Sequence, residues 1–279
     1  MPEQPRVVWP QVVELSQVPS TNTYLANLWE SSPELPPYLT VVADFQQQGR
    51  GRLGRYWVSP AGTSMLTSIL VPVTADRATW LPLAAGVALK ELLQSLLPGS
   101  EIELKWPNDL RIVTDEGEKK ISGILCQHLG RDLDRGVGGQ PDLGWVAVGI
   151  GANLTQSADQ LPPTPSTSVT LEGGPAVDPV LLAVACAASI QDLLSAPAGA
   201  LEAQVAAECS TVGRSVAAEL PNGEIVSGIA LALDADGALL VEDRHGQTHT
   251  LRAADVTHLS IANQAESPIH QAEPQGAHP

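Results

Sequence analysis

The segment that most constrains the fold is residues 49–55, which read GRGRLGR and are called the arginine segment below. Its G-x-G-x-x-G spacing is typical of the turn that joins a strand to a pyrophosphate-binding helix in doubly wound folds. The apolar run before it, residues 39–45, predicts the strand. The residues after it, RYWVSPAGTS, contain Pro60 and Gly62 and have no helical periodicity. Since no G-x-x-x-x-G-K-[ST] occurs either, the sequence excludes both a doubly wound dinucleotide fold and a P-loop.

Arginine makes the same segment informative in another way. Arg50, Arg52 and Arg55 alternate with glycines, in a chain whose net charge is -16. An acidic chain argues against a broad phosphate-binding surface for nucleic acid, so an anion site must be local. Glycines let backbone approach a ligand closely, and guanidinium groups bind carboxylate or phosphate bidentately. A basic surface turn is the plainer alternative, but this composition predicts a loop that folds over an anion.

Composition places the chain among globular proteins. Its 279 residues, 43% hydrophobic and 16% charged, suffice for one large domain or a main domain with a smaller partner. The N-terminus lacks the pattern of a secretory signal, and no apolar run reaches the length of a membrane span, so we predict a cytoplasmic protein without a membrane partner. Cys126, Cys186 and Cys209 lie far apart, which predicts reduced thiols rather than disulfides or zinc ligands.

Periodicity predicts both helices and strands in the first 210 residues. Ser20 or Thr21 should cap a first helix, and two longer apolar helices are expected over 79–97 and 177–196. Expected strands cover 39–45, the second half of 56–71, 101–106, 120–129 and 144–154. Residues 131–142 predict a surface loop that extends a hairpin, and residues 155–168 a mobile loop.

The sequence pattern changes after about residue 210. Short strands with closely spaced turn signals predict a small antiparallel barrel. The last stretch has too little apolar content to fold and predicts a disordered tail. The expected domains are therefore 1–210, 211–262 and 263–279.

Lysine is rare in this chain, with four in all, and two of the four flank predicted strand ends. Lys105 ends one strand and Lys120 opens another, where they could clamp a phosphate; either alone would be an ordinary solvated lysine. Asn108 and Asp109 follow Lys105 at a predicted turn, where capping is the plainer role. Glycines in the strand of VGIGANL (148–154) indicate that something approaches the backbone closely.

Taken together, STN (20–22), QQQGRGRLGR (46–55), KWPNDL (105–110), KISGIL (120–125) and VGIGANL (148–154) resemble the biotin protein ligase family in order and spacing. The resemblance runs from about residue 20 to 170, and the C-terminal strands resemble the family's small SH3-like barrel. It implies an α+β fold, with a mixed-sheet domain flanked by helices of the class II synthetase-like biotin/lipoate ligase type. It also implies an enzyme that joins biotin and ATP, with Mg²⁺, into biotinyl-5′-adenylate and transfers biotin to a lysine of a carboxyl carrier domain.

The resemblance also assigns roles to residues. Lys120, Arg52 and Lys105 would be catalytic, and the arginine segment would close over the adenylate to keep water from it. The biotin-binding set would be Ser20, Thr21, Asn22, Gln46, Gly49, Arg50, Gly51, Arg52, Lys120 and Gly123. The set near ATP and the adenylate would be Arg50, Arg52, Trp57, Lys105, Asn108, Asp109, Lys120 and Asn153. Metal ligands stay open, and Asp109 is a candidate for assisting deprotonation of the acceptor lysine.

Two features depart from the family pattern. Only nineteen residues precede Ser20, too few for the DNA-binding domain of some members, so we expect no nucleic-acid partner. Near the C-terminus, Asp255 can match the family's acidic residue, but His258 or Leu259 stands at the usual arginine position, which puts the C-terminal contribution to ATP binding in doubt. The oligomeric state stays open, a homodimer included. The rival functions are a lipoate ligase or octanoyltransferase of the same superfamily, and a non-catalytic biotin or nucleotide sensor.

Overall fold

A mixed seven-stranded sheet forms the centre of the larger domain. The structure, a computed structural model, describes residues 11–32, 34–131, 143–197 and 199–259. The sheet has the order β1-β2-β3-β7-β6-β5-β4, with β1 and β2 parallel and the other neighbours antiparallel. Its strands are β1 (Val12–Leu15), β2 (Thr40–Ala43), β3 (Ser64–Thr74), β4 (Glu101–Lys105), β5 (Asp109–Thr114), β6 (Gly117–Arg131) and β7 (Leu143–Asn153). The predicted mixed sheet is confirmed.

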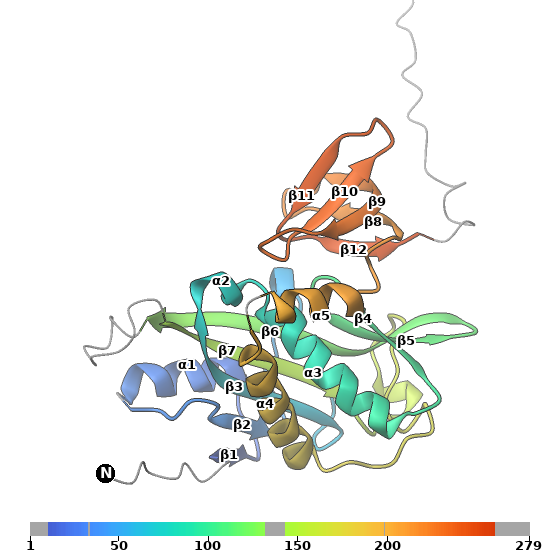
Figure 1. Ribbon diagram of the computed structural model, residues 1–279. Coiled ribbons are helices and arrows are strands. Elements are labelled where there is room, and N and C mark those ends of the chain that lie inside the picture. Colours follow the sequence, from blue (N-terminus) through green and yellow to red (C-terminus); the bar gives the residue numbers. More distant parts are fainter. Residues whose placement is uncertain (1–10, 33, 132–142, 198, 260–279) are drawn as a thin grey trace, which may run out of the picture.

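Helices cover the two faces of this sheet unequally (Figure 1). The helices are α1 (Thr21–Ser31), α2 (Ala75–Ala78), α3 (Leu81–Leu96), α4 (Pro179–Leu194) and α5 (Ala200–Glu208). Side chains of a strand alternate between faces, and on β3 Ile69 lies in the core shared with α3 and α4, whereas Leu70 packs with Leu25 of α1. The α1 face is covered mainly over β2, β3 and β7. The rest of that face, over β6, β5 and β4, carries the cleft described below.

The start of α1 differs from the prediction. Ser20 is the residue before the helix, but neither its hydroxyl nor that of Thr21 caps the helix. The backbone N–H of Thr21 instead donates to Gln46 Oε1 at 2.8 Å. A side chain from a distant loop therefore satisfies the first free N–H of the helix, and this ties α1 to the segment after β2.

A bulge in the pairing of β5 with β6 aims Lys120 at the open face. Asp109 pairs with Gly123, but the register then shifts, so that Arg111 pairs with Lys120. In regular pairing Lys120 and Gly123, three residues apart, would point to opposite faces. The extra residue, Ile121, is fully buried in the core, and Lys120 Nζ lies beside Gly123.

The C-terminal strands form a second sheet at one end of the larger domain (Figure 1). β8 (Ser215–Glu219), β9 (Ile225–Leu233), β10 (Leu239–Asp243), β11 (Thr248–Leu251) and β12 (Asp255–His258) are antiparallel in the order β11-β10-β9-β8-β12. Among the described strands, the edges β11 and β12 do not pair, so the barrel is not closed. Two buried tryptophans hold the domains together, because Trp80 Nε1 donates to the carbonyl of Ala235 and Trp106 Nε1 to that of Gly237, each at 3.0 Å.

Most predicted elements are present. The predicted strands and the three helices appear within a few residues of their expected bounds, while β1, β5, α2 and α5 were not predicted. The predicted surface loop lies almost wholly outside the described residues, and the predicted tail lies wholly outside them. The three cysteines are free, with Cys186 and Cys209 buried and Cys126 half-buried. Among the described residues, no helix is long and apolar enough to cross a membrane.

Candidate active site

A cleft of about 550 Å³ opens on the α1 face of the seven-stranded sheet. Among the described residues, six basic side chains line it against two acidic ones, Asp109 and Asp255. In a chain of net charge -16, this concentration of positive charge makes the cleft a local anion site. The basic residues are Arg50, Arg52, Arg55, Lys105, Arg111 and Lys120.

Strand register arranges the floor of the cleft in a row. Gly151 on β7 pairs with Gly123 on β6, Gly123 with Asp109 on β5, and Asp109 with Lys105 on β4. Directly paired residues share a face of the sheet. The row therefore runs across four strands, from bare glycine backbone at β7 to charged side chains at β5 and β4. The cleft follows this direction, perpendicular to the strands.

Uncharged polar groups form the end of the cleft next to α1. Ser68 Oγ, fully buried on β3, lies 2.8 Å from Thr21 Oγ1 and 2.6 Å from Asn22 Oδ1. The amide of Asn22 also donates to the carbonyl of Leu125 at 3.0 Å. A Cβ at Gly149 would lie 2.4 Å from Asn22 Oδ1, so only glycine leaves room for this arrangement. These hydroxyl and amide groups suit a neutral polar ligand.

Lys120 lies at the centre of the cleft. Its Nζ donates to Asp109 Oδ1 at 2.6 Å and lies 5.8 Å from the ring centroid of Trp57. Trp57 in turn lies against the backbone of the row, since a Cβ at Gly151 would be 2.5 Å from its ring. Because Gly123 and Gly151 have no side chain, the indole of Trp57 fits between the sheet backbone and Lys120. The Nε1 of Trp57 is buried and has no partner in the described part of the chain.

The arginine segment folds back on itself at the mouth of the cleft. Trp57 N donates to the carbonyl of Gly49 at 2.9 Å, and Gly51 N to that of Arg55 at 2.7 Å. Arg52 Nη1 reaches across to Asn108 Oδ1 at 3.2 Å, while Arg55 pairs with Asp255 of β12 at 3.0 Å. The segment thus contacts both the larger domain and the C-terminal sheet.

Two further cations lie at the β4 end. Lys105 is 6% exposed, and burial, followed by the charge of Arg111, lowers the pKa of its amine to about 8. Glu118, Asp109 and Asp255 oppose this shift. Arg111 points to the same face from β5, with its Nη2 3.8 Å from Asp109 Oδ2. Both side chains line the cleft.

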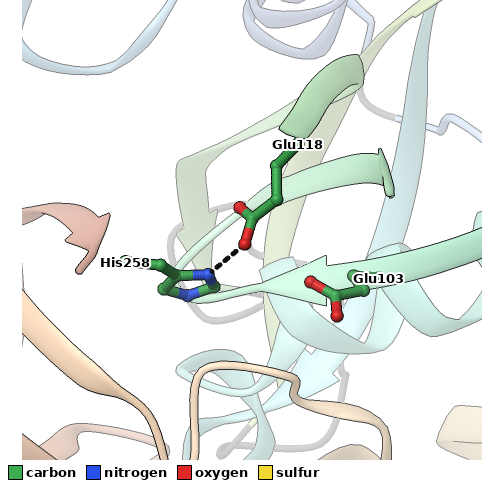
Figure 2. A group of neighbouring side chains, drawn as sticks. All are labelled: Glu103, Glu118 and His258. Carbon is green, nitrogen blue, oxygen red and sulfur yellow. Dashed lines mark hydrogen bonds and ion pairs between the residues drawn. The ribbon is translucent and has the colours of Figure 1, made fainter. Parts of the chain in front are cut away.

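A cluster of charges beside this end joins the two domains (Figure 2). Glu103 and Glu118 extend from the larger domain, and Figure 2 shows His258 of β12 hydrogen bonded to Glu118, at 2.8 Å. Arg214 contacts both carboxylates. The hydrogen bond from His258 is the first cause that lowers the pKa of Glu118 to about 2. The ligand atoms of the three residues lie within 4.8 Å of one another, as in a metal site, but a guanidinium already neutralises the carboxylates.

The structure brings almost all predicted site residues to this cleft. The lining includes Ser20, Thr21, Asn22, Gln46, Arg50, Gly51, Arg52, Trp57, Lys105, Asn108, Asp109, Lys120, Gly123 and Asn153. Gly49 lies behind it, where a Cβ would be 2.3 Å from the carbonyl oxygen of Trp57. Asn153 is held by its neighbours, since it donates to the carbonyl of Thr167 at 2.9 Å and accepts from Gln156 at 3.0 Å.

Several residues in or beside the cleft were not predicted from the sequence. Arg111 was not predicted because no strand was assigned after the expected turn at Asn108 and Asp109, although the alternation of Leu110 and Ile112 in DLRIVT is a strand signal. Ser68 does not line the cleft but contacts Thr21 and Asn22, which do; it lies in a predicted strand, and no local signal marks it. His258 does not line the cleft. Its Nδ1 is hydrogen bonded to Glu118, and its Nε2 lies 3.0 Å from Thr211 Oγ1.

Comparisons with known proteins agree with this arrangement. Residues 14–137 match the model of the biotin/lipoate A/B protein ligase family, and residues 211–259 that of the biotin protein ligase C-terminal domain. The chain is 32% identical, over 90% of both chains, to the biotin–[acetyl-CoA-carboxylase] ligase of Mycobacterium tuberculosis. This chain belongs to the biotin protein ligase family. The ligase of the same name from Paracoccus denitrificans is 33% identical over 87% of this chain and 98% of its own length.

The fold of this family member is also that of solved biotin protein ligases. The Aquifex aeolicus protein in complex with biotin and ATP superposes with a TM-score of 0.63 at 21% identity, over 90% of this chain and 100% of the other. At that identity the likeness shows the fold.

Proposed function

We propose that this protein is a biotin–protein ligase that activates biotin with ATP and transfers it to a lysine of a carboxyl carrier domain. The observation that carries the proposal is the polarity along one cleft. Uncharged hydrogen-bonding groups stand at the α1 end, Lys120 stands at the centre, and further cations follow toward β4. A ligand with a neutral polar head and a carboxylate, lying beside a triphosphate, matches this order.

In the first step, a carboxylate oxygen of biotin attacks the α-phosphorus of ATP. The bond from the α-phosphorus to the oxygen that bridges to the β-phosphorus breaks, and its electrons leave with pyrophosphate. Two anions must approach each other, so fixed positive charge at the point of contact lowers the barrier. Lys120 is the cation best placed to supply it, because the bulge aims its amine over Gly123 at the middle of the row.

The product is a mixed anhydride, which water would hydrolyse. The arginine segment lies at the cleft mouth and is tied by Arg52 to Asn108, so it would exclude water from the intermediate. In the second step, the neutral amine of the carrier lysine attacks the acyl carbon, the bond to AMP breaks and the amine loses a proton. Asp109 remains our candidate to assist that loss.

Magnesium fits the donor set of the cleft. Mg²⁺ is commonly held by one or two carboxylates together with substrate phosphates. Asp109 is a cleft carboxylate beside Lys120, and it would hold the ion that neutralises the triphosphate. We further propose that the domain boundary lies near residue 210, before β8, and that the protein acts in the cytoplasm.

Biotin-dependent exchange of labelled pyrophosphate into ATP tests the activation step. Purified protein should catalyse the exchange with biotin, and Lys120→Gln should reduce it by about 100-fold or more, since it removes the central charge. Lys119→Gln is the matched control, because its amine pairs with Glu116 at 2.6 Å outside the cleft lining. Exchange that requires lipoate in place of biotin would favour the related lipoate ligases, and no exchange with either would favour a sensor.

A further inference from the structure

Two cations at the β4 end of the cleft, the half-buried Arg111 and the buried Lys105, have N–H donors that the bonds described so far leave unsatisfied. The side chain of Arg111 is 20% exposed, and its Nε is buried with no partner. Within the described residues, its guanidinium makes no hydrogen bond, and the nearest carboxylate oxygen, on Asp109, is 3.8 Å away. A guanidinium carries five N–H donors, and burying them without acceptors is costly.

Lys105 is the second cation. It is buried, it lines the same end of the cleft, and in the described part of the chain its amine makes no hydrogen bond or ion pair. Arg111 lies close enough for its charge to lower the pKa of the Lys105 amine. Two like charges that repel each other in a buried site destabilise the protein unless an anion joins them.

The neighbouring carboxylates balance these two positive charges only in part. Glu103 pairs with Arg111 across β4 and β5, but its carboxylate contacts Arg214 of the C-terminal domain. Asp109 is hydrogen bonded to Lys120. Asp109 also forms the long ion pair with Arg111, and one oxygen of Glu103 is buried without a partner. In the described part of the chain, Lys105 and Arg111 therefore line the cleft without a close hydrogen-bond acceptor.

We infer that Arg111, together with Lys105, binds the β- and γ-phosphates of ATP and retains them as the departing pyrophosphate. The inference rests on the proposed function and adds a residue outside the motifs that carry the family resemblance. Pyrophosphate fits because it is a polyanion that can accept hydrogen bonds from both groups at once. Its place follows from the register, since Lys105 pairs with Asp109, Arg111 pairs with Lys120, and the reaction occurs at Lys120.

The test compares substrates that do and do not carry these phosphates. In Arg111→Gln, the KM for ATP and the inhibition constant for inorganic pyrophosphate should both rise by about tenfold or more, which is about 1.4 kcal/mol or more of lost binding. The KM for biotin and the inhibition by AMP should stay unchanged. Arg111→Lys keeps a point charge that phosphate accepts, and it should recover most of the pyrophosphate inhibition.

Arg244→Gln is the matched control, because it removes one positive charge from an exposed turn of the C-terminal domain. Unchanged pyrophosphate inhibition in Arg111→Gln would overturn the inference, as would an equal rise in the KM for ATP and biotin, which would mark a structural role. Calorimetric titration with inorganic pyrophosphate separates the two proposals. Wild-type protein that binds pyrophosphate through Arg111 but shows no biotin-dependent exchange would contradict the proposed function alone.

Discussion

Glycines along β7 decide which side chains can reach the cleft floor. The pattern VGIGANL indicated close approach to the backbone, and this prediction is confirmed, because Asn22 lies against Gly149 and Trp57 against Gly151. The identity of the approaching groups could not be predicted, since both come from segments far away in the sequence. A glycine in a strand shows that space is needed but does not show for what.

Gly149→Ala should weaken biotin binding while leaving the fold intact. The new methyl group would lie 2.4 Å from Asn22 Oδ1, so Asn22 must move and lose its contacts with Ser68 and the Leu125 carbonyl. We expect the KM for biotin to rise about tenfold, because small displacements of positioning groups are costly. Gly144→Ala on the same strand, whose Cβ would be 3.4 Å from His128 Nε2, should leave it unchanged. An unaltered KM in Gly149→Ala would show that Asn22 does not position biotin.

Arg111 and Lys120 show two different limits of sequence analysis at this scale. Arg111 follows Asp109 by two residues in a short polar strand, so its alternation with Leu110 and Ile112 could have placed it on the face of Asp109. Lys120 was predicted to be near the anion, but the bulge that aims it has no local signal. A register shift results from the pairing of two strands and is decided by the packing of Ile121.

At the scale of elements, the arginine segment has two anchors of unequal burial. Arg52 lies within the cleft and bonds Asn108, whereas the pair of Arg55 with Asp255 is exposed, with side chains 57% and 51% accessible. Exposed ion pairs contribute about 0–1 kcal/mol. The segment should therefore stay in place mainly through Arg52.

Arg52→Gln should release biotinyl-adenylate from the cleft. We expect free adenylate to accumulate about tenfold faster than in wild type, because a hydrogen bond from a charged donor typically contributes about 1.5–3 kcal/mol. Released adenylate would also label lysines of unrelated proteins added to the assay. Arg55→Gln should behave like wild type. Slower release from Arg52→Gln would contradict a role for the segment as a cover.

Elements with strong periodicity were predictable, and short ones were not. The apolar helices α3 and α4 and the strands β2, β3 and β7 follow directly from the pattern of apolar residues. β1 and α5 are short and depend on tertiary packing. α5 buries only Leu201 and Val205, which is too little periodicity to distinguish it from a loop.

At the scale of the molecule, the domains meet through a polar network as well as through tryptophans. In one consistent set of donors, the backbone N–H of Trp106 donates to Thr211 Oγ1, the Thr211 hydroxyl donates to His258 Nε2, and His258 Nδ1 donates to Glu118. Arg214 closes the network on the carboxylates. His258, one of the two residues that could stand at the family's arginine position, thus serves the interface between the domains.

Glu118→Gln should lower the free energy of unfolding at pH 6 by about 2 kcal/mol, the scale of a hydrogen bond to a charged group. The folded-state pKa of Glu118, about 2, lies below its ordinary 4.5. Its contribution is therefore present above pH 4.5 and is lost as the pH falls toward 2. Denaturant unfolding from pH 6 to 2.5 measures the difference from wild type, which should shrink in that window. Glu116→Gln, in the neighbouring exposed turn, should show no such difference; a constant difference for Glu118→Gln would contradict the assignment.

The row of paired residues across β7, β6, β5 and β4 also fixes distances that no side chain can alter. Neighbouring strands are about 4.8 Å apart, so the step from the glycine floor at β7 to Lys120 on β6 is one strand spacing, and the step to Lys105 is about three, near 14 Å. For substrates bound along the cleft as we propose, the strand spacing sets the distance between the head-group end and the phosphates. A compound with the same head group but an acyl chain one or two carbons shorter would bind at the α1 end of the cleft. Its carboxylate would then lie too far from the α-phosphorus of ATP to react.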